Sequence, residues 1–223
     1  METKIHKLTG AVALGLLLTT ACAPMASKAG AESDHKMMMQ SNGKAADLRT
    51  GLNILFAEHV SLAASATGAA LGGRDAEFKA AAGALDANSI AISKAIGSVY
   101  GADAEAAFLP LWRKHIGFVV DYTVGLATKD KAKQTKAVNE LVGYTDDLGA
   151  FLSSANPNLP KATVAELVKG HILTLKDVID AQAAKDYNKT YMLLRTATGH
   201  MHMIADPLAD AIVKQFPDRY AGM

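Results

Sequence analysis

The feature that most constrains this chain of 223 residues is a sequence pattern that returns every 56 residues. Apolar positions recur at this offset, and two positions keep the same residue in all three copies. These positions are a leucine and, one helical turn later, a histidine: Leu55, Leu111 and Leu167, followed by His59, His115 and His171. A fixed period with matched core positions indicates an internal repeat. We therefore expect three copies of one structural unit.

Each copy is predicted to be a pair of antiparallel helices. The first helix of each pair has apolar residues at alternating spacings of three and four, which is typical of an amphipathic helix. Short turns follow near residues 72–75, 128–130 and 184–186, each with an acidic residue that can cap the returning helix. The expected fold is all-α, a six-helix up-and-down bundle built from three repeated αα-hairpins. The repeats cover approximately residues 47–102, 103–158 and 159–214.

The N-terminal residues 1–22 have the pattern of a secretory signal segment. Two lysines precede a short apolar run, and small residues and the single cysteine, Cys22, follow it. Cys22 stands where a lipoprotein is acylated, although Thr19 replaces the usual aliphatic residue, so ordinary signal cleavage is the alternative. Residues 23–46 suit a flexible tether, and residues 47–223 form the bundle domain. We expect an extracytoplasmic protein, lipid-anchored to the envelope membrane on its periplasmic or outer side.

The charge balance and the residue types exclude several function classes. Without the first 21 residues, the chain has 21 basic and 21 acidic residues, which gives no electrostatic attraction for nucleic acid. Cys22 is the only cysteine, so the domain has neither disulfides nor thiolate metal sites. No nucleophile elbow or phosphate-binding loop is present, and the sequence therefore indicates no enzyme class. It identifies no protein partner either.

One level of the bundle is predicted to be rich in polar side chains. Residues equally far from a hairpin turn lie side by side, which pairs each repeated histidine with a residue of the returning helix. One interpretation is a buried polar layer in which each pair is hydrogen-bonded. The other is that the imidazoles converge on a metal ion. The candidate ligands are His59, His115, His171 and His200, with Met201 as a weaker one. Asn88 and Tyr144 are the candidates to contact these ligands rather than the metal.

The residue types around this layer favour copper among the metals that imidazole binds. His200-Met201-His202-Met203 and the tether segment 35–39 supply thioether and imidazole groups. Glu58 and Asp86 lie off the helix seam, so a di-iron carboxylate site is not indicated. Another transition metal is an alternative to copper, and haem is less favoured. The function hypothesis is metal handling or sensing, and the alternative is a structural or partner-binding lipoprotein.

Three segments resemble a known group of proteins. They are Ser98-Val99-Tyr100-Gly101, the run LWRKHIGFVVDYT at residues 111–123, and the tail from His200 to Pro217. These segments are similar to an uncharacterised family of bacterial extracytoplasmic helical proteins, some of them loosely labelled copper amine oxidase-like. The resemblance implies the location and the helical fold. It implies no functional residue, and the label does not indicate oxidase chemistry.

Overall fold

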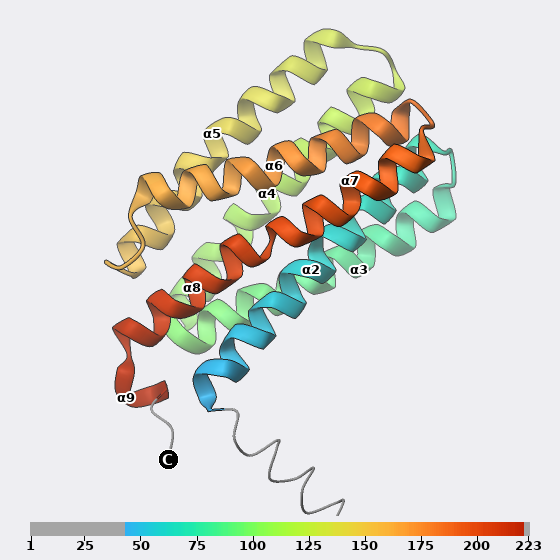
Figure 1. Cartoon of the computed structure of the whole chain (residues 1–223). Coiled ribbons are helices and arrows are strands. Elements are labelled where there is room, and N and C mark those ends of the chain that lie inside the picture. Colours follow the sequence, from blue (N-terminus) through green and yellow to red (C-terminus); the bar gives the residue numbers. More distant parts are fainter. Residues whose placement is uncertain (1–42, 221–223) are drawn as a thin grey trace, which may run out of the picture. The chain divides into compact units, whose positions relative to one another are not determined.

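Helices make up almost all of residues 43–220, the part of the chain that the computed structural model describes. Within this range the chain runs through seven helices of at least 14 residues and a final single-turn helix, without any strand (Figure 1). The fold is therefore all-α, as predicted. The predicted signal segment, Cys22 and the methionines of the tether lie outside the described residues. The helices are α2 (Lys44–Leu71), α3 (Asp75–Tyr100), α4 (Ala102–Ala127), α5 (Lys131–Ala155), α6 (Lys161–Ala183), α7 (Tyr187–His200), α8 (His202–Gln215) and α9 (Pro217–Tyr220).

Three tight turns with the same backbone geometry reverse the chain after α2, α4 and α6. One residue in each turn adopts the left-handed conformation: Gly73, Lys129 and Lys185, with φ of 67°, 58° and 58°. The N–H of the residue that follows donates to a carbonyl near the end of the preceding helix, at 2.8 to 3.0 Å. This pattern is a common way to end a helix. It returns α3, α5 and α7 along the helices before them.

Side chains cap the returning helix in two of these three turns. Asp130 accepts a hydrogen bond from the backbone N–H of Lys133 at 2.9 Å, and Asp186 accepts one from Lys189 at 3.0 Å. The residue at the matching place in the first turn is Arg74, which makes no such cap. The acidic residues of the second and third turns therefore satisfy backbone donors that a helix start leaves free.

The helices close into a ring with an inner layer. Each long helix contacts the next along the chain, and α2 contacts α7 and α8, which closes the ring. In Figure 1, α6, α7 with α8, and α2 run side by side. The three first helices of the hairpins, α2, α4 and α6, also contact one another. Side chains that point inward from these three helices can therefore meet.

Helix α2 is long and apolar enough to cross a membrane, judged by length and composition alone. Much of that apolar stretch is buried within the bundle, because α2 contacts α3, α6 and α8. Its buried residues include Leu52, Phe56 and Val60, which belong to the hydrophobic core. The apolar composition of α2 is thus accounted for by its place in the core.

The last long segment differs from the single helix that the sequence predicts. It is divided into α7 and α8 at Met201, whose N–H bonds to the carbonyl of Thr198 at 3.2 Å, three residues back. Such a bond tightens the helix locally. The side chain of Met201 is buried, so tertiary packing holds the interruption in place. Pro207 predicts a kink because it lacks an N–H, yet it lies further along, inside α8.

Candidate metal centre

Three histidines from three different helices meet inside the bundle. His59 of α2, His115 of α4 and His171 of α6 are 1%, 3% and 4% exposed. One ring nitrogen of each lies within 4.8 Å of those of the other two. Nε2 of His59 and Nε2 of His115 lie 3.4 Å apart. We call these three residues the histidine triad.

Burial keeps the triad uncharged. It lowers the pKa of His59 well below the usual value, and the neighbouring His115 and His171 lower it further. Burial likewise lowers the pKa of His115 to about 3, with a smaller contribution from His171. The pKa of His171 falls to about 4 through burial and, to a lesser degree, through His200. At neutral pH all three imidazoles are neutral, which is the form that binds metal ions.

Several polar atoms at this level have no hydrogen-bond partner among the described residues. A buried polar group without a partner costs roughly 1–3 kcal/mol, so most such groups in folded proteins are satisfied. Here the unpartnered groups are concentrated around a single place in the bundle, and a bound ion would use one lone pair of each imidazole. The buried atoms are His59 Nδ1, His115 Nδ1, His171 Nδ1, Asn88 Oδ1, Trp112 Nε1 and the Tyr144 hydroxyl.

Asn88 and Tyr144 do not form the histidine hydrogen bonds expected for a buried polar layer. Asn88 donates through Nδ2 to the carbonyl of Leu55 at 3.0 Å and to Oε2 of Glu58 at 2.7 Å. Tyr144 stacks on His115, with ring centroids 4.9 Å apart. Tyr144 therefore lies beside a triad histidine, and neither residue makes the hydrogen bond to a histidine that the buried polar layer would require.

His200, the fourth candidate ligand, lies outside the triad. Its Nε2 donates to the carbonyl of Leu167 at 2.9 Å, so this nitrogen is not free to bind a metal. Its ring packs closely against Gly170, where a Cβ would come within 2.6 Å of it. The bond from His200 to Leu167 matches the bond from Asn88 to Leu55 in the first hairpin. His200 thus joins α7 to α6.

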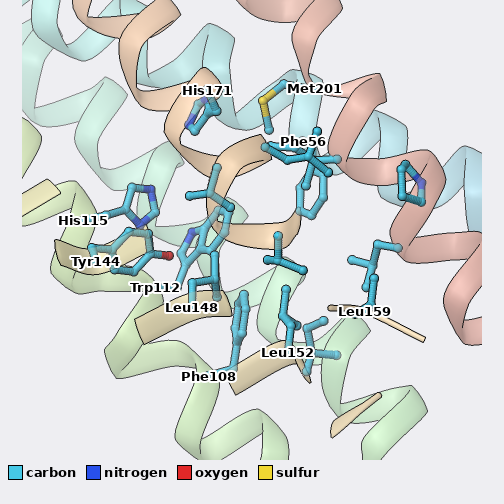
Figure 2. A pocket seen from close by; sticks show the side chains of 17 residues that line it. Phe56, Phe108, Trp112, His115, Tyr144, Leu148, Leu152, Leu159, His171 and Met201 are labelled. Carbon is cyan, nitrogen blue, oxygen red and sulfur yellow. The ribbon is translucent and has the colours of Figure 1, made fainter. Parts of the chain in front are cut away.

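Met201 lies beside the triad, on the wall of a small cavity. The cavity has a volume of about 50 Å³, its exposed wall is apolar throughout, and His115 and His171 also line it. Figure 2 shows His115 and Tyr144 on one side of the cavity and His171 and Met201 at its upper end. Met201 therefore shares this cavity with two of the three histidines.

A larger cleft approaches the triad from α2, α3 and α4. It measures about 490 Å³ and reaches His59 and His115. Its lining includes Asp86 and Arg113, which form an ion pair with two short contacts of 2.7 and 2.8 Å. The cleft gives an ion a path from the surface to the triad.

Among the histidine, cysteine and carboxylate side chains of residues 43–220, only imidazoles contribute ligand atoms to the close group at the triad. Glu58 accepts its hydrogen bond from Asn88, and Asp86 pairs with Arg113, so neither carboxylate belongs to the group of close ligand atoms. Trp112 contacts two of the histidines, with ring centroids 5.0 Å from His59 and 4.6 Å from His115. The sequence treats Trp112 as a core residue, and it is buried, but it also forms part of the wall around the triad.

Comparison with known proteins adds no assignment, because no family model, curated protein or solved structure matches this chain. The functional argument depends on the geometry of the site.

Proposed function

We propose that this protein binds one transition-metal ion through His59, His115 and His171, and serves in metal handling or sensing at the bacterial envelope. The observation that carries the proposal is the approach of three neutral, buried imidazole nitrogens to within 4.8 Å of one another. Three imidazoles on the inner helices of a bundle are a suitable partial or complete first shell for copper or zinc.

Copper in its monovalent form is the preferred ion. The free-energy cost of burying an ion rises with its charge. Among the described residues, no carboxylate belongs to the group of close ligand atoms, so no negative charge there would offset a divalent ion. Met201 adds a soft sulfur close to His115 and His171.

The first test is the metal content of the full-length protein, purified without an affinity tag from cells grown with added copper, zinc or iron. We expect about one ion per chain, and we expect His115→Gln and His171→Gln to lose most of it. The control is His202→Gln, because His202 is exposed on α8. Protein that is metal-free under all three conditions would contradict the proposal. A His202→Gln variant that loses as much metal as the two triad variants would also contradict it.

The envelope location is part of the proposal and is supported by residues 1–22 and by the resemblance to the extracytoplasmic family. Cys22 would carry the lipid anchor. Radiolabelled palmitate should label the wild-type protein, and Cys22→Ser should abolish the label and move the protein from the membrane to the soluble fraction. If Cys22→Ser stays in the membrane fraction, the anchor is not at this residue.

We also propose that the bundle is a triplicated hairpin with a period of 56 residues. The three turns with left-handed residues at 73, 129 and 185 support it, since their backbone hydrogen bonds match position by position. The equivalent bonds of Asn88 and His200 to the helix before them support it as well. In this proposal the three histidines of the triad occupy the same position of the repeat, once in each hairpin.

A partner-binding protein is the second candidate, and the cleft between α2, α3 and α4 favours it. The cleft is lined mostly by apolar side chains, with alanine and valine the most frequent, and Val120 and Val124 on its wall are exposed. Such a groove can receive an apolar segment of another protein. In this case His115→Gln and His171→Gln would lower stability, and neither would change metal content.

A further inference from the structure

The cavity beside the triad exists where the third hairpin departs from the other two. One helical turn before the histidines, α2 and α4 place Phe56 and Trp112, but α6 places Val168 at the matching position. Another turn earlier, Phe108 of α4 is matched by Val164 of α6. The three side chains on α2 and α4 are large and the two on α6 are small, and all five line the cavity. The small valines leave the space that an aromatic ring would fill.

The aromatic residues opposite these valines are packed in a rigid stack. Phe56 and Trp112 are stacked with centroids 6.0 Å apart, and Phe108 and Trp112 with centroids 5.3 Å apart. Stacked rings of this kind cannot easily move to fill a neighbouring gap. The cavity is therefore held open by its surroundings.

The contents of the cavity are limited by its size and its wall. A volume of about 50 Å³ is enough for a molecule of a few atoms. Its exposed wall is apolar, and apolar cavities in proteins stay dry and take up small neutral molecules. His115 and His171 border the same cavity, so a ligand there lies next to an ion held by the triad.

We propose that the metal in the triad keeps one coordination position toward this cavity, and that the position binds a small neutral diatomic molecule that donates a lone pair, such as carbon monoxide. The inference rests on the proposed metal binding by the triad. The three histidines occupy three positions, and Met201 stays on the cavity wall beside the fourth, which remains open as in metal sites that bind an external molecule. The binding step is simple coordination, and no bond within the diatomic molecule is formed or broken.

The test uses carbon monoxide as the probe and full-length protein loaded with monovalent copper under anaerobic, reducing conditions. Infrared spectroscopy should show one C–O stretching band, which moves when ¹³CO is used, with about one bound molecule per copper. Val168→Phe supplies the ring that Phe56 supplies in the first hairpin and should weaken carbon monoxide binding at least about tenfold. Val168→Ala enlarges the cavity at the same position and should retain the band.

A second variant and a metal-free measurement cover the case in which Val168→Phe fails to fold or to bind copper. Leu208→Phe fills the cavity from α8, on a different wall. Xenon binding to the metal-free protein, followed by ¹²⁹Xe NMR, should occur in the wild type and be lost in Leu208→Phe.

The outcomes separate the inference from the proposed function. A protein that binds copper but not carbon monoxide overturns the inference and leaves metal binding intact. Equal carbon monoxide affinity in the wild type and in a folded, copper-loaded cavity-filling variant also overturns it. A protein that binds no metal overturns both proposals.

Discussion

At the scale of single residues, the triad is unusual because burial has changed the chemistry of three identical side chains in the same direction. Histidine normally gains a proton near pH 6.5, but burial keeps His115 neutral to about pH 3 and His171 to about pH 4. Protons therefore compete weakly with a metal ion at this site.

The lowered pKa values predict how the stability of the metal-free protein depends on pH. The unfolded chain binds protons on these histidines below about pH 6.5, while the folded chain does not until about pH 3 to 4. With respect to these histidines, the free energy of unfolding is therefore highest above pH 6.5. It decreases as the pH falls from 6.5 toward the pKa values of the folded protein. Each such histidine lowers the free energy of unfolding by up to about 1.4 kcal/mol per pH unit.

Urea denaturation at several pH values between 7 and 5 measures the slope of the free energy of unfolding against pH. His115→Gln should reduce it, because one of the buried groups is removed, and His171→Gln should reduce it for the same reason. A slope that is the same in wild type and His115→Gln would contradict the prediction.

At the scale of helices, the sequence predicted most of what is observed. Helical periodicity located the helices, and the matched positions showed that three histidines share one level. Periodicity gives the face of a helix, but it does not give the rotamer or the hydrogen-bond partner of a side chain. The bond of His200 to Leu167 and the interruption at Met201 could therefore not be read from the sequence.

Two glycines of α5 test how closely the helices pack. A Cβ on Gly149 would lie 2.7 Å from the backbone carbonyl oxygen of Lys161, which cannot move without shifting α6. A Cβ on Gly143 would have no atom within 4 Å. We expect Gly143→Ala to stabilise the protein by up to about 1 kcal/mol through helix propensity, and Gly149→Ala to destabilise it.

Thermal and urea unfolding of both glycine variants give this comparison directly. Because the two substitutions are identical and lie in the same helix, their difference reports the contact between α5 and Lys161. If Gly143→Ala and Gly149→Ala stabilise the protein equally, the backbone oxygen of Lys161 lies too far from Gly149 to oppose a Cβ there.

At the scale of the whole molecule, the triad joins all three hairpins, since each contributes one histidine. A metal that binds only the folded protein raises its stability by about 2.7 kcal/mol when free metal is 100 times the dissociation constant. For a domain of this size we expect the melting temperature to rise by about 5 to 10 °C. The transition should remain a single step, because the ion bridges all three units.

Differential scanning calorimetry with and without monovalent copper measures the shift. His202→Gln should show the same shift as the wild type, and His171→Gln should show little or none. A shift confined to one part of a divided transition would mean that the ion holds fewer than three hairpins.

The distribution of the proposed ligands along the chain would also limit when an ion can be acquired. His59 and His171 are separated by two complete hairpin turns, so the third ligand is in place only after α6 has docked against α2 and α4. If residues 1–22 export the chain before it folds, no metal can be bound during synthesis. The supply of ions outside the cytoplasm would then decide which metal the protein carries.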